Sequence, residues 1–258
     1  MPRPLLLACF LACAGALSGQ SNEANIIYRT LCFRQVNNIT SLHVRGPGEG
    51  GMKEMPLWTA EFTRPDKMKL VDGKAVFFVP DKSPEAKEPF KPVAQVAVPP
   101  TNRVLFLFLP APEGSPAPYE VRALAADEKS YPLGQTRVLN MAPVAMRIHL
   151  GENERVVGPG KGDILPKPKS LNKYDQFNVL IEFQRGEEWM RVSNTRWKSS
   201  DRKRDLVIAF IDPVTKRPVA NLFEDVPATV DPNAAPANHG GDAPPPPPAP
   251  APAAGARP

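Results

Sequence analysis

Two tryptophans and an arginine near the end of the chain have the types and spacing best suited to recognition. Trp189, Arg191 and Trp197 occur at even spacing in a segment that predicts a strand, where alternate side chains point to the same side. Exposed aromatic rings beside a cation can stack on sugar rings or cover a partner protein. Two alternatives stay open: the tryptophans face the core, or a bulge breaks the alternation. Trp189, Arg191 and Trp197 are therefore the predicted ligand-binding residues.

Carboxylates are the other groups in this region that could do chemistry. They are Glu152, Glu154, Asp163, Glu187 and Glu188. A carboxylate-based hydrolase would need two of them within reach of one another. The chain has no nucleophile elbow, zinc-protease, P-loop or dinucleotide-binding motif. We therefore expect a non-catalytic protein with no catalytic residues, and keep the hydrolase as a second alternative.

The histidine and cysteine residues do not indicate a metal or cofactor site. His43 and His149 have no metal-ligating residue at ligand spacing within their own predicted strands. We therefore expect no metal and no cofactor, and interpret both histidines as scaffold positions. Cys32 is the only cysteine after the N-terminal segment, so no internal disulfide is expected. Its apolar surroundings predict a buried, inert thiol, and a reactive thiol is the alternative.

The elements that must position these residues are strands. The 33 prolines leave little room for long helices. Short alternating or fully apolar runs rich in Val, Ile and Phe are bounded by turn residues, as in sandwiches and barrels. The runs 104–109 and 206–211 are apolar throughout and predict central buried strands. Asp72-Gly73 predicts a two-residue hairpin turn.

The chain predicts an internal repeat of about 100 residues. One set of identities lies 103 residues apart, namely Tyr28, Arg34 and Asn37 with Tyr131, Arg137 and Asn140. Two further matches join 42–44 to 148–150 and 103–110 to 204–213. The fold expected is all-β, with two tandem immunoglobulin-like β-sandwich units. One larger sandwich is the alternative.

Both ends of the chain differ from this body. A short basic start and the apolar run 5–14, followed by small residues, have the grammar of a signal peptide. Cleavage is expected after residue 16, 18, 19 or 20, and lipidation at Cys9 or Cys13 is the minor alternative. The final residues are rich in proline and alanine, which favours a disordered, extended tail. The predicted organisation is 1–20 signal peptide, 21–127 first unit, 128–228 second unit and 229–258 tail.

Charge and hydropathy narrow the expected partners. A formal net charge of +5 is modest for 258 residues and lacks the basic stripe of a nucleic-acid binder. The densest basic stretch, 198–205, predicts a solvated hairpin loop, with contact to an anionic polymer or membrane surface as the alternative. No segment after the signal peptide is long and apolar enough to predict a transmembrane span. The sequence does not fix the oligomeric state.

Three segments resemble uncharacterised exported bacterial proteins with duplicated β-sandwich domains. They are Tyr131–Met141, the Trp197-x-x-x-x-Arg202 stretch and Leu206–Asp212. The resemblance covers most of the body and implies the same fold and export. It brings no activity, cofactor or site residues.

The expected function is that of an exported, non-catalytic β-sandwich protein. Its role would be structural or binding, and it would act in the periplasm, on the cell surface or after secretion. The expected partner is an envelope protein or a polysaccharide. The first alternative is a carbohydrate- or peptidoglycan-binding module that uses the Trp189/Trp197 face.

Overall fold

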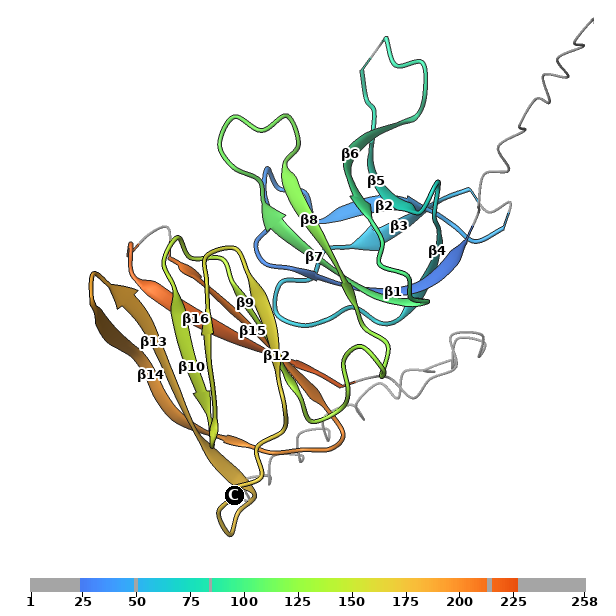
Figure 1. The fold of residues 1–258 in the computed structure, drawn as a ribbon. Coiled ribbons are helices and arrows are strands. Elements are labelled where there is room, and N and C mark those ends of the chain that lie inside the picture. The colour runs from blue at the N-terminus through green and yellow to red at the C-terminus, as the bar shows by residue number, and fades with distance from the viewer. Residues whose placement is uncertain (1–23, 49–50, 84, 213–214, 227–258) are drawn as a thin grey trace, which may run out of the picture. The chain divides into compact units, whose positions relative to one another are not determined.

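The computed structural model describes residues 24–48, 51–83, 85–212 and 215–226. Within them the chain forms sixteen strands in four sheets and no helix, which confirms the predicted all-β class (Figure 1). It follows that these residues contain no helix that could cross a membrane. The predicted signal peptide and the proline–alanine tail lie outside the described residues.

The first half of the body forms two four-stranded sheets. Its strands are β1 (Asn25–Cys32), β2 (Ser41–Arg45), β3 (Met52–Pro56), β4 (Asp66–Lys69), β5 (Lys74–Pro80), β6 (Phe90–Ala97), β7 (Arg103–Pro110) and β8 (Tyr119–Ala125). One sheet has the order β4-β1-β7-β8, and the other has the order β3-β2-β5-β6.

The second half repeats this arrangement. Its strands are β9 (Thr136–Asn140), β10 (Met146–Leu150), β11 (Asn153–Val157), β12 (Gly162–Leu165), β13 (Gln176–Arg185), β14 (Glu188–Lys198), β15 (Arg204–Ile211) and β16 (Pro218–Asp225). The sheet orders β12-β9-β15-β16 and β11-β10-β13-β14 are those of the first half shifted by eight strands.

Strand pairing confirms the repeat in detail. The β1–β7 pair and the β9–β15 pair are both parallel, although all other pairs of strands are antiparallel. His43 on β2 lies opposite Glu54, and His149 on β10 lies opposite Glu154. The two histidines therefore occupy equivalent positions, as predicted.

The predicted 103-residue match of Tyr28, Arg34 and Asn37 with Tyr131, Arg137 and Asn140 is wrong. Tyr28 lies inside β1, whereas Tyr131 precedes β9. In the parallel pairs, Arg29 lies opposite the third residue of β7 and Arg137 opposite the third residue of β15, so Arg29 is the equivalent of Arg137. Equivalent residues of β1 and β9 are therefore 108 positions apart in the sequence, whereas those of β7 and β15 are 101 apart.

The observed strand order also differs from the immunoglobulin-like order we expected. In constant-type immunoglobulin domains the second and third strands belong to opposite sheets. Here β2 and β3 pair as an antiparallel hairpin in one sheet, as do β10 and β11. The short links between these strands favour a local hairpin over a crossing between sheets.

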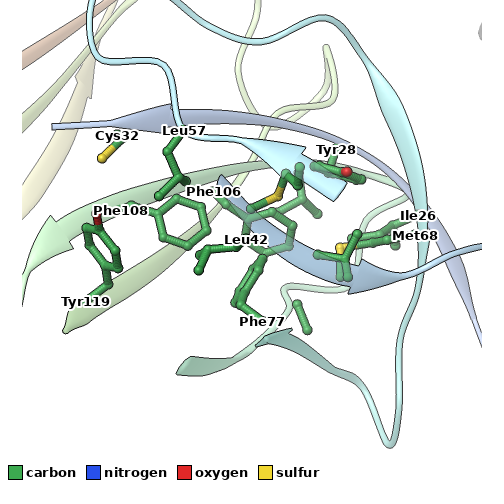
Figure 2. Close-up of a cluster of buried hydrophobic side chains, with 14 of the residues drawn as sticks. Ile26, Tyr28, Cys32, Leu42, Leu57, Met68, Phe77, Phe106, Phe108 and Tyr119 are labelled. Atoms are coloured by element: carbon green, nitrogen blue, oxygen red, sulfur yellow. The ribbon is translucent and has the colours of Figure 1, made fainter. Parts of the chain in front are cut away.

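Each half has its own apolar core between its two sheets. In the first half, Tyr28, Phe106 and Phe108 from one sheet meet Leu42 and Phe77 from the other (Figure 2). The ring of Phe77 makes edge-on contacts with both phenylalanines, at centroid distances of 5.2 and 4.9 Å. The second half packs β9 and β15 against β10 and β13 in the same way.

β7 and β15 are buried on both faces, which explains their uninterrupted apolar sequences. Val104, Phe106 and Phe108 belong to the first core, while the intervening leucines of β7 join a third cluster. That cluster also contains Leu206 and Ile208 of β15. We call it the junction cluster, because it joins the β1–β7 sheet of the first half to the β9–β15 sheet of the second. The prediction of two central buried strands is confirmed.

An ionic cluster borders the junction cluster. Asp225 binds Arg29 of the first half and Arg204 of the second half, the latter at 2.6 Å. The guanidinium groups of Arg137 and Arg204 lie over the Tyr131 ring, with their carbon atoms 4.3 and 4.8 Å from its centroid. Burial lowers the pKa of the Arg29 guanidinium, and Asp225 opposes that shift. The cluster therefore depends on one carboxylate that pairs with the buried Arg204 and the half-buried Arg29.

The basic stretch 198–205 is not the hairpin loop we predicted. It leads from β14 in one sheet to β15 in the other. Lys203 forms ion pairs with Asp205, at 3.1 Å, and with Glu224, and Arg204 is buried in the ionic cluster. The end of this segment therefore packs against the body, because Lys203 and Arg204 form ion pairs with residues of β16.

A turn and the start of a strand depend on residue type. Asp72 and Gly73 adopt φ angles of 51° and 71° between the bridged residues Val71 and Lys74, as predicted for this hairpin. Gly162 begins β12, where an added Cβ would lie 2.6 Å from a methyl carbon of Leu139. A side chain at that point would force β12 away from β9.

The ionic cluster predicts a large effect of removing its carboxylate. Replacing Asp225 with alanine leaves Arg29 and Arg204 unpaired at a buried site, so we expect a loss of about 3–5 kcal/mol in the free energy of unfolding. Urea denaturation measures this. Asp163→Ala removes an exposed partner of Arg155 and should cost about 0–1 kcal/mol. Equal losses in the two variants would contradict the bridging role of Asp225.

Candidate functional site

The structure separates the two tryptophans that the sequence placed together. Trp189 and Arg191 project from the solvent side of β14, beside Gln184 and Glu182 on β13. Trp197 lies opposite the buried Phe177 and packs against the second core, with a centroid distance of 6.4 Å between the two rings. The expectation of a shared tryptophan face is therefore wrong.

A β-bulge causes this separation. The pairing of β13 with β14 shifts between Ile181 and Glu182, so that Val192 has no residue directly opposite it. One extra residue reverses the alternation, and the two ends of β14 turn opposite side chains toward the core. The alternative that a bulge breaks the alternation is the one that holds.

Trp189 belongs to a cluster of polar and aromatic groups on the solvent side of the β11-β10-β13-β14 sheet. The guanidinium carbon of Arg147 lies 4.6 Å from the Trp189 ring centroid. Glu182 Oε2 accepts hydrogen bonds from Arg147, at 2.7 Å from Nε and 2.6 Å from Nη2. We call Arg147, His149, Glu182, Trp189 and Arg191 the Trp189 patch.

His149 connects this patch to the neighbouring strand β11. Its Nδ1 lies 3.6 Å from Glu154 Oε2, and its Nε2 lies 3.7 Å from Glu182 Oε2. Both contacts become ion pairs when the imidazole is protonated. The equivalent His43 instead packs on the ring of Phe90, at a centroid distance of 4.7 Å. The two scaffold positions therefore have different surroundings.

Three of the five candidate carboxylates have local partners. Glu152 accepts hydrogen bonds from the backbone amides of Lys169 and Ser170, which lower its pKa. Asp163 pairs with Arg155 at 3.1 Å. Glu187 and Glu188 lie at the exposed β13–β14 turn, whereas Glu154 lies on β11 beside His149. The described part of the chain contains no group of three or more His, Cys, Asp or Glu side chains that could hold a metal ion.

Cys32 is buried at the end of β1, as predicted. Burial raises the pKa of its thiol to about 11, despite neighbouring groups that favour the thiolate. At neutral pH the sulfur is therefore protonated and enclosed, which suits packing and not nucleophilic chemistry.

Sequence reasoning missed Arg147, which lies against the Trp189 ring, and Glu182, which binds Arg147. The signal was present, because Met146–Leu150 alternates apolar and polar residues and 177–183 does so except at Leu180, which turns Arg147 and Glu182 to the solvent side. What the alternation does not supply is the pairing of β10 with β13 and of β13 with β14. Only that pairing brings both residues to Trp189.

Comparison with known proteins adds no name to this site. No family model matches the chain, and no curated protein sequence matches it.

The buried thiol predicts a clear difference in reactivity between the folded and unfolded chain. In a chain that starts at residue 21, Cys32 is the only cysteine. Because its pKa is raised, a disulfide reagent at mildly alkaline pH should modify no thiol until the chain is unfolded in guanidinium chloride, when one thiol reacts. A Cys32→Ser variant gives the background. Rapid modification of the folded protein would contradict the inert assignment.

Proposed function

We propose that the chain is an exported, non-catalytic binding protein of the cell envelope or its surroundings, and that its Trp189 patch binds an acidic glycan. Export is supported by the signal-peptide grammar of residues 1–20 and by the resemblance to exported β-sandwich proteins. The proline- and alanine-rich composition of residues 229–258 is typical of a spacer between a domain and its surroundings.

The solvent side of β14 supports an anionic ligand. Arg191, Arg196 and Lys198 are exposed and share that side. Arg196 Nε donates to Asn178 Oδ1 at 3.3 Å, which orients the guanidinium along the sheet. Arginine forks bind carboxylate and phosphate groups with two parallel hydrogen bonds. A row of such groups favours a polymer that carries a regular series of negative charges.

The observation that carries the proposal is the stacked pair of Arg147 and Trp189. Glu182 fixes the guanidinium at 2.6–2.7 Å, and the guanidinium in turn supports the half-buried indole ring at 4.6 Å. A ring held in one orientation loses little conformational freedom when a sugar stacks on it. The patch is thus arranged before any ligand arrives.

The local roles of the carboxylates support a binding function over hydrolysis. A glycosidase needs two carboxyl groups about 5–10 Å apart on either side of the scissile bond. Glu152 and Asp163 each bind a local amide or basic group. Glu154 and Glu182 lie on either side of His149, but Glu182 is held by Arg147 at 2.6–2.7 Å. This arrangement uses them to hold loops and strands.

Glycan binding is tested by exchanging single tryptophans. Trp189→Ala should weaken binding to an acidic polysaccharide such as polygalacturonate about tenfold, or about 1.4 kcal/mol, because the stacking platform is lost. Affinity electrophoresis measures the retardation, with dextran as the uncharged comparison. Trp58→Ala is the matched control, since Trp58 is 39% exposed and lies in the first half of the chain.

Three results would contradict the glycan proposal. They are an equal loss of binding in the two variants, equal retention on dextran, and no retention of the parent protein. Release of reducing ends from the polysaccharide during the experiment would instead favour the hydrolase alternative.

Export is tested separately from binding. Expression of residues 1–258 in a bacterium with a general secretion pathway should give a mature N-terminus at residue 17, 19, 20 or 21, because these positions follow the small residues Ala16, Ser18 and Gly19 or lie one residue beyond them. N-terminal sequencing of the periplasmic or extracellular fraction measures this. Recovery of an intact Met1 in the cytoplasm would overturn the export proposal.

A further inference from the structure

A groove with an apolar floor opens at one end of the second half. It lies between the β13–β14 end and the β15–β16 end and has a volume of about 700 Å³. Its apolar lining comes from Val144, Phe183, Met190, Val192, Ile211 and Pro218. Several of these side chains also pack on the second core, so the groove is an opening into the end of that core.

The repeat shows why this end is open. Pro110 of β7 pairs with Tyr119, and Ile211 of β15 pairs with Pro218, so Tyr119 and Pro218 are equivalent. In the first half, the Tyr119 ring packs edge-on against Phe108 at 5.9 Å and fills the end of the core. By the same register, Ala209 replaces Phe108 in the second half.

Tyr119 also fastens the neighbouring loop in the first half. Its hydroxyl accepts a hydrogen bond from the Val36 amide at 2.9 Å and donates to the Ile39 carbonyl at 3.2 Å. Pro218 has neither a ring of that size nor a hydroxyl group. The second half therefore lacks two aromatic side chains and the hydrogen bonds of the Tyr119 hydroxyl, and Pro218, the equivalent of Tyr119, lines the groove.

The rim of the groove is basic. Arg185, Arg191, Lys216 and Arg217 all line it, and all four are exposed. Arg185 Nη1 lies 3.6 Å from Met190 Sδ, which places a cation directly beside the apolar floor. Among the described residues that line the groove, none is acidic. Asp212 lies nearby but outside the lining, and its carboxylate accepts a hydrogen bond from the Thr215 amide.

We propose that this groove binds a single-chain anionic amphiphile, with the hydrocarbon chain on the Val144–Met190–Ile211 floor and the anionic group at Arg185 and Arg217. The volume lies in the usual range for a ligand of this size. An acidic sugar would pair with the rim and leave the floor in water, and a neutral chain would leave the cations without a partner. The amphiphile satisfies both parts of the lining.

This second site is distinct from the Trp189 patch. Trp189 points to the solvent side of the sheet, whereas Met190 lies opposite the buried Phe183 on the inner side. Arg191 is the residue that the two sites share. For this reason Arg191 takes no part in the experiment.

Isothermal titration calorimetry with the chain from residue 21 to residue 258 tests the proposal. The probe is decanoate below its micelle concentration, compared with butyrate and with decyltrimethylammonium. We expect decanoate to bind with one site per chain, and each comparison ligand to bind at least about tenfold more weakly, because one lacks the hydrocarbon chain and the other has the opposite charge. Equal affinity for decanoate and decyltrimethylammonium, or no heat from decanoate, would overturn the proposal.

Two variants that introduce a negative charge locate the site. Met190→Glu and Arg217→Glu should each weaken decanoate binding at least about tenfold, since both add a negative charge at the groove. Arg196→Glu on the same strand is the control and should stay within about twofold. Met190 and Arg217 are exposed, and an unchanged urea midpoint verifies that each variant folds. An equal loss with Arg196→Glu, or full affinity in both groove variants, would show that the groove is not the site.

Trp189→Ala separates this inference from the glycan proposal. It should reduce polysaccharide binding and leave decanoate binding unchanged. Loss of decanoate binding in Trp189→Ala would overturn the independent groove, whatever the polysaccharide does.

Discussion

The burial of β7 and β15 on both faces is the constraint on which the rest of the body depends. Along each strand, alternate side chains enter two different cores: Phe106 and Val207 enter the sandwich cores, whereas Leu107 and Ile208 enter the junction cluster. A strand of this kind has no polar side, so the sheet that contains it must be covered on both faces. The two halves therefore need each other, because either half alone would expose the leucine face of its central strand.

Apolar contact alone does not determine the register in which two such sheet faces pack. The ionic cluster determines it, because ion pairs form only between particular residues. Asp225, at the end of β16, binds cations from both halves, and the Tyr131 ring lies beside two guanidinium groups. Charges are costly to bury unless each one has a partner. A different register between the halves would separate Asp225 from Arg29, so the cluster penalises alternatives that the leucines would tolerate.

The sequence predicts those features that depend on neighbouring residues and misses those that depend on pairing. The apolar runs 104–109 and 206–211 identify central strands, and Asp72-Gly73 identifies its turn, because strand burial and positive φ angles are local demands. The bulge at Val192 is different, since it exists only in the register between β13 and β14. For the same reason Trp189 was found, but its neighbours Arg147 and Glu182 were not. The wrong match of Tyr28 with Tyr131 has a related cause: identical residues can align in a sequence while they lie at different points of the strand order.

The differences between the two halves indicate where a duplicated fold has acquired its surface chemistry. Shared topology accounts for the cores and for the equivalent places of His43 and His149. The surroundings have diverged: His43 packs on Phe90, whereas His149 lies between Glu154 and Glu182. At the end of the sheets, Tyr119 closes the first core and Pro218 leaves the second one open. Both changes occur in the second half and neither touches the junction cluster, so the residues that hold the two halves together stay separate from those that are free to meet a ligand.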